Sequence, residues 1–358
     1  MLVVLAPGAK PDEVEQVTGL LAGHGYGVHA ITGAERTVVG ATGGPMPDEE
    51  LTADQLRSLP FVDEVHEIDK PYRLAARDHH PEPTIIDVRG VKIGEGMPVV
   101  VMAGPCTVES REQVMETARA VKSMGATILR GGAYKPSTSP YGFPGMGVAG
   151  LEILAEAREE TGLPIITEVM DPRAVETVCR YADILQIGTR NMQNYDLLRE
   201  IGRTQTPICL KRGMSSRVEE WLQAAEYVLV AGNPNVMLCE RGIRTFETWT
   251  RNTLDLAAIP AIRALSHLPV MVDPSQGTGR ASLVSALCRG AVAVGADALL
   301  IEVHPHPERA LKDGPQQVTP DLFRNLMTEL SPVADAVGRP LLAAPPDGVS
   351  AEGLTSAP

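Results

Sequence analysis

Five cationic residues lie at or just after the ends of short apolar runs: Arg130, Lys135, Arg190, Lys211 and Arg241. The chain has 32 basic and 45 acidic residues, a formal net charge of −13. Cations gathered at one place repel one another unless each pairs with a carboxylate or an anion binds among them. For five together, a small substrate with phosphate and carboxylate groups is the better explanation, because arginine binds such anions through paired hydrogen bonds.

A second group of candidates combines one thiol with two carboxylates. Cys106 follows an early apolar run, whereas Glu302 ends the last apolar run and Asp313 lies in the segment beyond it. A thiolate with two carboxylates suits a borderline divalent metal such as Mn, Fe, Co or Zn. A buried cysteine is, however, more often a small core residue than a ligand, so spacing alone leaves both interpretations open.

The elements that would position these residues form a repeat from about residue 85 onwards. Short, continuously apolar strands alternate there with amphipathic helical stretches. We expect eight strands, at 99–104, 126–131, 164–169, 183–188, 207–212, 235–240, 269–274 and 297–303. Eight such units in about 250 residues predict a closed (β/α)8 TIM barrel, whose chemistry lies at the carboxyl ends of the strands. An open doubly wound sheet is the alternative, weakened because no GxGxxG follows the first strand.

The first seventy residues have a different rhythm, β-α-β-β-α-β, which is typical of a small ferredoxin-like α+β domain. Its expected elements lie at 2–6, 11–23, 26–31, 36–42, 48–59 and 62–68. The sequence therefore predicts an α/β protein with a ferredoxin-like domain at 1–70, a polar linker at 71–84, a catalytic barrel at 85–336 and a fraying tail at 337–358.

Composition excludes several classes of protein. With 44% hydrophobic and 22% charged residues, the chain is globular rather than disordered or fibrous. The negative net charge and the 4% aromatic content argue against nucleic acid and anionic membranes as partners. Five scattered cysteines without a CxxC pair indicate a reducing compartment, and no apolar stretch approaches the roughly 20 residues of a membrane helix. We expect a cytoplasmic location.

Over about residues 85–330 the chain resembles a known family. The motifs AGPCTVES, LRGGAYKP, STSPYGFPG, QIGTRNMQN, CLKRG, LCERGIRTFE, VDPS and EVHPHPERALKDGPQ occur in order along the barrel strands. Together they are similar to 3-deoxy-D-arabino-heptulosonate 7-phosphate (DAHP) synthase of the type I beta-like kind, the first enzyme of the shikimate pathway to the aromatic amino acids. The segment 1–70 resembles the regulatory domain that some members carry.

The resemblance implies a reaction and its residues. Phosphoenolpyruvate condenses with erythrose 4-phosphate, with the phosphate and carboxylate of phosphoenolpyruvate held by Arg190, Lys211 and Arg241. Arg130 and Lys135 would lie beside them, and Lys135 would also take part in proton transfer. The family's divalent metal is held by a Cys, a His, a Glu and an Asp, which points to Cys106, Glu302 and Asp313, with Gln276 in place of the histidine.

Two departures from the family's pattern affect the aldehyde side. Gln276 follows VDPS where the family has His, and an amide oxygen is a poorer ligand than imidazole for these metals. KPST replaces KPRT, so Ser137 stands where the family's Arg grips the phosphate of the aldose, while Thr138 is retained. If erythrose 4-phosphate is the substrate, another cation must bind that phosphate, and Arg280 at the start of a barrel helix is the candidate.

Three functions stay open at this point. The first is DAHP synthase, and the second is a phosphoenolpyruvate-dependent aldol-type synthase with a different aldehyde acceptor. The third is a catalytically impaired barrel that serves as a regulatory or interaction subunit. The resemblance also implies feedback by an aromatic amino acid, a homo-oligomer such as a tetramer, and chorismate mutase as a partner protein.

Overall fold

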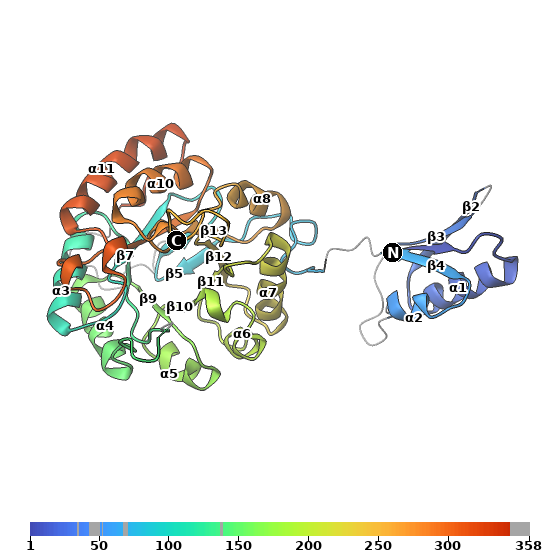
Figure 1. Cartoon of the computed structure of the whole chain (residues 1–358), viewed down its shortest axis with the longest axis horizontal. Helices are drawn as coiled ribbons and strands as arrows, with labels where there is room; N and C mark the ends of the chain where they lie inside the picture. Colours follow the sequence, from blue (N-terminus) through green and yellow to red (C-terminus); the bar gives the residue numbers. More distant parts are fainter. Residues whose placement is uncertain (34–35, 43–50, 52, 67–70, 137–138, 344–358) are drawn as a thin grey trace, which may run out of the picture. The chain divides into compact units, whose positions relative to one another are not determined.

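The computed structural model describes residues 1–33, 36–42, 51, 53–66, 71–136 and 139–343. The chain divides into two compact units, Met1–Pro71 and Tyr72–Pro358 (Figure 1). Across the described residues, no helix combines the length and apolarity needed to cross a membrane.

The first unit has the expected ferredoxin-like topology. Its antiparallel sheet has the order β2-β3-β1-β4 and carries two helices. The elements are β1 Leu2–Leu5, α1 Pro11–Gly23, β2 Gly27–Thr32, β3 Thr37–Thr42, α2 Ala53–Arg57 and β4 Val62–His66. Apolar side chains from the sheet and both helices, among them Leu5, Leu21 and Leu56, are fully buried and form the core of this unit.

The second unit contains a closed parallel barrel, as the alternating pattern predicted. Each strand pairs with the next in the chain, and the last pairs with the first. The strands are β7 Val100–Gly104, β8 Ile128–Arg130, β9 Ile165–Glu168, β10 Ile184–Ile187, β11 Ile208–Lys211, β12 Val236–Glu240, β13 Val270–Val272 and β14 Ala298–Glu302. All are buried along their whole length, which explains why they read as continuous apolar runs.

Helices surround the barrel in sequence order (Figure 1). They are α3 Arg111–Ser123, α4 Val148–Thr161, α5 Val175–Cys179, α6 Tyr195–Gly202, α7 Val218–Val230, α8 Ala258–Leu265, α10 Ala281–Ala293 and α11 Pro320–Ala336. Short elements follow the strands at η1 Pro172–Ala174, η2 Thr189–Asn191, α9 Pro274–Thr278, η3 Pro307–Arg309 and η4 Gly314–Gln316. Their apolar faces pack on the outside of the strands as one continuous core.

A hairpin formed by β5 Ile86–Val88 and β6 Val91–Ile93 packs on the side chains that fill the inside of the barrel. Its turn residue Arg89 contacts Asp183, which directly precedes β10, through Nε and Oδ1 at 2.5 Å. The hairpin therefore covers the amino-terminal end of the barrel. The strand ends that carry the candidate residues lie at the opposite end.

The expected linker, residues 71–84, lies against the barrel from Tyr72 onwards. Three successive backbone N–H groups, from Arg73 to Ala75, donate to the carboxylate of Glu226 on α7 at 2.8–2.9 Å. Ala76 is buried. The segment is polar in composition, but its few apolar side chains and its backbone donors find partners on the barrel.

The expected fraying tail is likewise attached at its start. Arg339 forms an ion pair with the buried Asp297 at 2.8 Å, and Leu341 bridges to Val99 beside β7. Leu342 packs on the residues inside the barrel. Residues 344–358 lie outside the described part of the chain.

Candidate active site

The barrel register brings the ends of its first and last strands together. Glu302 on β14 lies opposite Gly104 on β7, and Cys106 follows two residues later. Gly104 has a φ of 152°, and a Cβ there would lie 2.1 Å from a carbonyl oxygen of β8, so this close approach requires glycine. Asp313 precedes η4, in the segment after β14.

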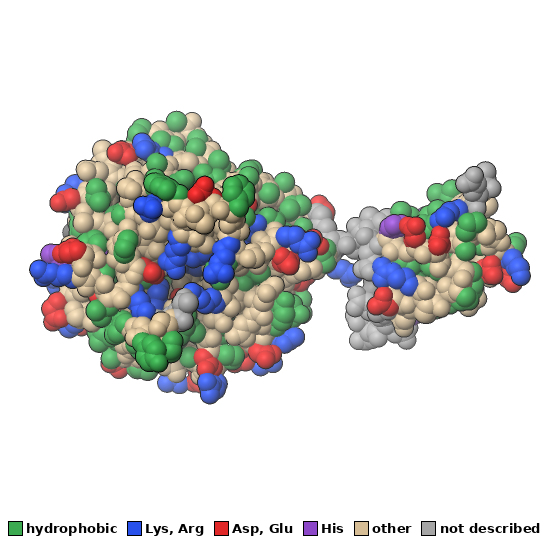
Figure 2. Space-filling view, in the orientation of Figure 1, with side chains coloured by type: hydrophobic (Ala, Val, Ile, Leu, Met, Phe, Trp, Pro, Cys, Tyr) green, Lys and Arg blue, Asp and Glu red, His purple; other side chains and the backbone are tan. Residues whose placement is uncertain are grey.

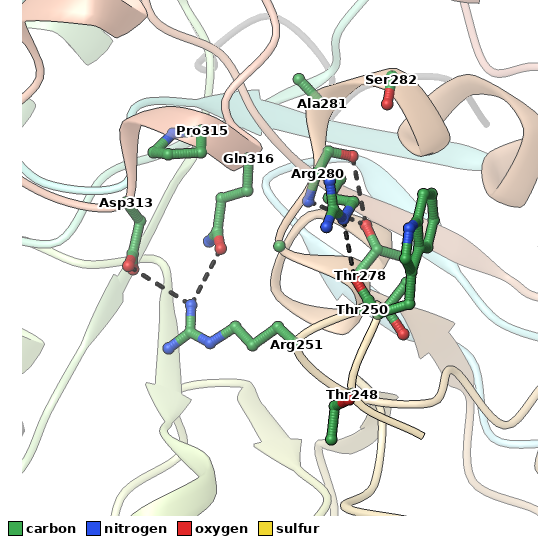
Figure 3. Close-up of a pocket in the computed structure, with 12 residues that line it drawn as sticks. Thr248, Thr250, Arg251, Thr278, Arg280, Ala281, Ser282, Asp313, Pro315 and Gln316 are labelled. Atoms are coloured by element: carbon green, nitrogen blue, oxygen red, sulfur yellow. Dashed lines mark hydrogen bonds and ion pairs between the residues drawn. The ribbon is translucent and has the colours of Figure 1, made fainter.

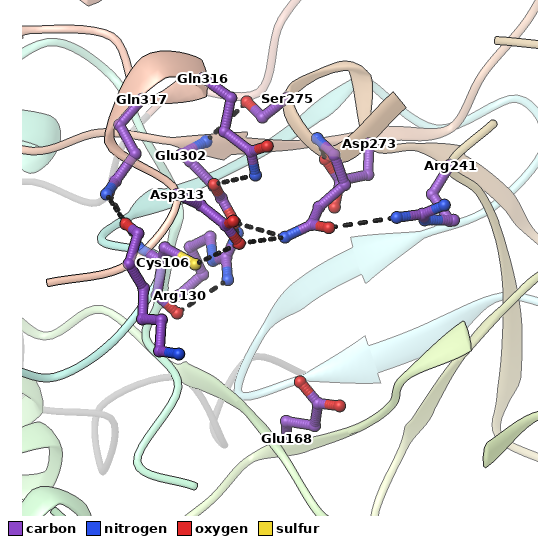
Figure 4. Close-up of polar contacts among 12 residues, drawn as sticks. Cys106, Arg130, Glu168, Arg241, Asp273, Ser275, Glu302, Asp313, Gln316 and Gln317 are labelled. Atoms are coloured by element: carbon purple, nitrogen blue, oxygen red, sulfur yellow. Dashed lines mark hydrogen bonds and ion pairs between the residues drawn. The ribbon is translucent and has the colours of Figure 1, made fainter. Parts of the chain in front are cut away.

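The three candidate metal ligands form one cluster. One ligand atom from each of Cys106, Glu302 and Asp313 lies within 4.8 Å of the others. The Cys106 thiol donates to Oδ2 of Asp313 at 3.4 Å (Figure 4). Burial, with the nearby charge of Glu302, raises the pKa of this thiol to about 12. A bound cation would displace that proton, and a thiolate with two carboxylates suits a borderline divalent metal.

Glu302 is the carboxylate of the cluster that has the most hydrogen-bond and charge partners. Burial raises the pKa of its carboxyl group, but the charges of Arg130 and Lys135 outweigh burial and hold that pKa well below its ordinary value. Arg130 donates from Nη1 to Oε1 at 2.7 Å, and Gln316 donates from Nε2 to Oε2 at 2.6 Å. The carboxylate therefore stays ionised and fixed in orientation at neutral pH.

Gln276, expected as the fourth metal ligand, presents its nitrogen to the cluster rather than its oxygen. Nε2 lies 3.1 Å from Oε1 of Glu302 and 3.4 Å from Oδ2 of Asp313. Its Oε1 accepts from Nη2 of Arg241 at 3.2 Å. An amide nitrogen has no lone pair for a metal, so in this orientation Gln276 lies beside the ligands without being one.

The five candidate cations all follow strands at the carboxyl end of the barrel. Arg130 ends β8 and Lys135 lies in the segment after it, Arg190 is in η2 after β10, Lys211 ends β11, and Arg241 follows β12. Four of them are buried, from 3% exposed for Arg130 to 8% for Lys135, and Arg190 is exposed. Figure 2 shows Lys and Arg side chains gathered near the middle of the barrel face in view.

Some of these cations form ion pairs with carboxylates, and others do not. Arg130 pairs with Glu302, and Lys211 Nζ lies 2.5 Å from Oδ2 of Asp273. Within the described ranges, Arg241 and Lys135 have no carboxylate at ion-pair distance. Burial lowers the pKa of Arg241, because the charge of Asp273, which acts in the opposite direction, does not fully offset the removal of this cation from water. Two buried cations therefore have free capacity for an anion.

Glu168 adds a buried carboxylate at the end of β9 (Figure 4). Its Oε2 accepts from Nε2 of Gln186 at 3.2 Å, while Oε1 has no hydrogen-bond partner among the described residues. A Cβ at position 188 would lie 2.1 Å from that oxygen, so Gly188 makes room for it. The charge of Glu168 also helps to raise the pKa of Lys135, after the acidic groups of Cys106 and Glu302 and against the effect of burial.

On the aldehyde side, Ser137 and Thr138 lie outside the described residues. Arg280 caps the start of α10, and its guanidinium stacks on the ring of Trp249 at 4.3 Å from the ring centre. Both residues line a cavity of about 760 Å³ between the segments that follow β12, β13 and β14 (Figure 3). Arg251 lines it too, donating to Asp313 at 3.4 Å and to Gln316 at 2.9 Å.

Sequence reasoning missed the amides that hold the cluster. Gln316 binds Glu302, and Oε1 of Gln317 accepts from the backbone N–H of Cys106 at 3.0 Å. It also missed Arg251 as a partner of Asp313. The available signal was weak, because two adjacent glutamines shortly after Asp313 have no periodicity and no charge to single them out.

Comparison with known proteins identifies the chain's relatives. The model of the DAHP synthetase I family matches residues 74–336, and that of the DAHP synthase ferredoxin-like domain matches residues 1–70. The phospho-2-dehydro-3-deoxyheptonate aldolase of Thermotoga maritima is 48% identical over 338 residues, which are 94% of this chain and 99% of that protein. A 2-dehydro-3-deoxyphosphooctonate aldolase of Caulobacter vibrioides is 36% identical over 260 residues, 67% of this chain and 89% of that protein.

Solved structures agree. The crystal structure of the Thermotoga maritima DAHP synthase superposes with a TM-score of 0.86 at 47% identity, covering 95% of this chain and 99% of that one. A truncated form of the DAHP synthase from the same organism has a TM-score of 0.71 at 47% identity, covering 76% of this chain and all of that one (100%). The chain belongs to the DAHP synthetase I family and carries that family's ferredoxin-like domain ahead of its barrel.

Proposed function

We propose that this chain is a phospho-2-dehydro-3-deoxyheptonate aldolase, or DAHP synthase, which condenses phosphoenolpyruvate with erythrose 4-phosphate. One observation carries the proposal beyond family membership. Buried cations with no carboxylate partner in the described chain, Arg241 and Lys135, lie at the same end of the barrel as a thiol–carboxylate cluster. This arrangement provides an anion site next to a site for a Lewis acid.

The reaction joins C3 of phosphoenolpyruvate to the aldehyde carbon. Water then adds at C2, and inorganic phosphate leaves. In this proposal Arg190, Lys211 and Arg241 hold the phosphate and carboxylate of phosphoenolpyruvate, with Arg130 next to them. Because arginine is always charged and forked, it holds such anions in one orientation.

Lys135 supplies the proton that the aldehyde oxygen needs as it becomes a hydroxyl group. Burial lowers the pKa of Lys135, but the acidic groups of Cys106 and Glu302 outweigh this effect and raise it above the ordinary value. The side chain therefore holds its proton at Nζ until substrate arrives. The water that adds at C2 releases a proton, which restores Lys135.

Cys106, Glu302 and Asp313 would hold the divalent cation, whose identity among Mn, Fe, Co and Zn stays open. When bound, that ion polarises the aldehyde oxygen as a Lewis acid. The chain's own contribution is to hold the two carboxylates in a fixed orientation, with Glu302 fully buried and Asp313 partly exposed. Arg130 and Gln316 do this for Glu302, and Arg251 does it for Asp313.

The acceptor's phosphate would bind in the cavity beside Asp313. Arg280 and Arg251 both line this cavity, and the backbone N–H groups at the start of α10 favour an anion there. These two arginines are candidates to replace the charge that Ser137 lacks. A synthase with a different aldehyde acceptor is the second candidate function, favoured by Ser137 and Gln276 and consistent with relatives named for an octonate product.

Phosphate release from phosphoenolpyruvate, measured with a panel of aldehydes, tests both candidates. Erythrose 4-phosphate should give the highest kcat/KM. A faster reaction with an unphosphorylated or five-carbon aldehyde would move the assignment to the second candidate. No phosphate release with any aldehyde, in the presence of Mn²⁺, would contradict both.

The wider context is also proposed from the family. The ferredoxin-like domain would bind an aromatic amino acid that inhibits the barrel, the protein would assemble as a homo-oligomer such as a tetramer, and chorismate mutase is a candidate partner. A cytoplasmic location rests on the five cysteines, none of which forms a disulfide. Light scattering, effector titration and cell fractionation would test these expectations separately.

A further inference from the structure

Gln276 lies between the two halves of the candidate active site. Its side chain is buried, with 8% of the residue exposed, and it contacts Arg241 on one side and the carboxylates of Glu302 and Asp313 on the other. It therefore touches both the group expected to bind the substrate anion and two groups expected to bind the cation. Among the described residues, no other side chain forms hydrogen bonds to all three.

The orientation of the Gln276 carboxamide follows from the chemistry of its neighbours. A guanidinium can only donate, so the group that faces Arg241 must be the oxygen. Ionised carboxylates can only accept, so the group that faces Glu302 and Asp313 must be the nitrogen. In this orientation both ends of the carboxamide have hydrogen-bond partners among the protein's own side chains.

The opposite orientation suits the site with both ligands bound. Rotation by a half-turn about the last side-chain bond exchanges the oxygen and nitrogen without changing the shape of the group. The oxygen then faces a cation held by Glu302 and Asp313, and the nitrogen can donate to an anion held by Arg241. With only the cation present, the nitrogen of the rotated amide faces the guanidinium of Arg241, which is also a donor. With only the anion present, the oxygen faces the carboxylates of Glu302 and Asp313, which are also acceptors.

We propose that the Gln276 carboxamide is a two-state coupling element that makes anion binding at Arg241 and divalent-cation binding at Cys106, Glu302 and Asp313 mutually favourable. The inference rests on the proposed function for the identity of the two ligands. Each ligand biases the same equilibrium, and by linkage each raises the affinity of the other by the same factor. Gln276 acts as a positioning residue that works through its neighbours.

Calorimetric titration of Mn²⁺ into the full-length protein, with and without saturating phosphoenolpyruvate, measures the coupling. In the native protein phosphoenolpyruvate should lower the Kd for Mn²⁺ by about tenfold or more, equivalent to roughly 1.4 kcal/mol. Simple attraction between an anion and a cation contributes to that factor. Two variants measure the contribution of charge attraction alone. In Q276H the imidazole can face the cation without a carboxamide rotation, and in Q276M the side chain has a similar length but no amide.

Both variants should retain only the part due to charge attraction, about threefold or less. Their circular dichroism and thermal unfolding must match the native protein, and the side-chain amide resonance of Gln276 should shift only when both ligands are present. Equal coupling factors in all three proteins would overturn the proposal, as would phosphoenolpyruvate binding without any Mn²⁺ binding. Failure of phosphoenolpyruvate itself to bind the native protein would overturn the proposed function, and this inference with it.

Discussion

Cys106 is a fully buried cysteine with a partner that an ordinary core cysteine lacks. Its thiol donates to Asp313, and its backbone N–H donates to Gln317, so both its position and its proton are tied to the cluster. The other buried cysteines include Cys209 and Cys239, which lie among the apolar side chains inside the barrel. All of these cysteines are buried, so burial does not distinguish a candidate metal ligand from a packing residue. The polar contacts of Cys106 do.

Replacing Cys106 by alanine should abolish activity and metal binding while leaving the fold in place. The change removes one sulfur atom from a polar cluster, for which a stability loss of about 1 kcal/mol is expected. Cys239→Ala is the matched control, because it removes the same atom from an equally buried position away from the cluster. Activity and bound metal are measured for both. A C106A protein that retains half its activity would contradict the ligand role.

Gln276→His should tighten metal binding. An imidazole offers a nitrogen ligand where the native amide directs its nitrogen hydrogens at Glu302 and Asp313. We expect the Kd for Mn²⁺ in the absence of substrate to fall by at least about tenfold, close to 1.4 kcal/mol. Competition with a calibrated chelator provides the measurement. If the native protein keeps full activity after exhaustive chelation, with no metal in the sample, metal dependence itself is wrong.

Substitutions at Ser137 and Arg280 test which residues bind the phosphate of the aldehyde acceptor. Ser137→Arg should lower the KM for erythrose 4-phosphate by about tenfold, since a charged fork replaces a single hydroxyl group. The KM for phosphoenolpyruvate should stay within about twofold. Arg280→Ala should raise the KM for the aldose, whereas Arg289→Ala near the other end of α10 should not.

If S137R brings no improvement and R280A causes a severe loss, the phosphate site has moved to the cavity beside Trp249. If neither substitution changes the KM and unphosphorylated aldehydes react better, the acceptor is a different molecule.

At the scale of elements, the barrel could be predicted and the site could be predicted only in part. Strands buried on both faces appear as apolar runs, so the expected strand at 99–104 became β7 Val100–Gly104 with little change. The order of polar residues at strand ends then followed from the fold. Helix α9 was missed, although Asp273 before a proline is a recognisable helix start, because five residues give no period.

Contacts between distant segments set the remaining features. The orientation of Gln276 depends on Arg241 and Glu302, which lie on other strands, so no local pattern contains it. The segment 72–84 is polar and proline-containing, yet it packs on α7 and on the residues just after α8 through partners more than 100 residues away. These pairings are tertiary contacts, and the spacing of residues along one sequence does not reveal them.

The attachment of segment 72–84 should weaken as the pH falls, through His267. Its Nε2 lies 2.7 Å from the carbonyl oxygen of Leu74 and must donate, so Nδ1 accepts from the hydroxyl of Thr84 in the neutral ring. Burial lowers the pKa of His267 and outweighs the hydrogen bond to Leu74, which raises it; the charges of His80 and Arg77 lower this pKa further, and that of Glu226 opposes them. The folded protein therefore binds this proton less readily than the unfolded chain.

The difference between the folded and unfolded pKa of His267 sets how stability changes with pH. The stabilisation from neutral His267 is fully present above its unfolded pKa of about 6.5 and is lost as the pH falls below that value. The midpoint of urea unfolding should decrease more between pH 7.5 and pH 5.5 in the native protein than in His267→Gln. His79→Gln, an exposed histidine in the same segment, is the control and should behave like the native protein. Identical pH dependence in all three would show that His267 does not contribute.

At the scale of the whole molecule, the described candidate residues all lie in one of the two units. Every described candidate residue, from Cys106 to Asp313, belongs to the unit that begins at Tyr72. The described residues of the first unit contain no group of three metal-ligating side chains. Its core is its own, built from β1, α1 and their neighbours, so neither unit needs the other to bury its apolar residues.

Deleting residues 1–70 should therefore preserve turnover and remove inhibition by tyrosine or phenylalanine, if the native protein shows it. The position of the cut matters, because residues 72–84 belong to the barrel through Glu226 and His267. A chain that starts at residue 71 should keep kcat within about twofold, whereas one that starts at residue 85 should unfold at a lower temperature. A folded 71–358 protein without turnover would place catalytic groups in the first unit, and one that kept full inhibition would place the effector site in the barrel.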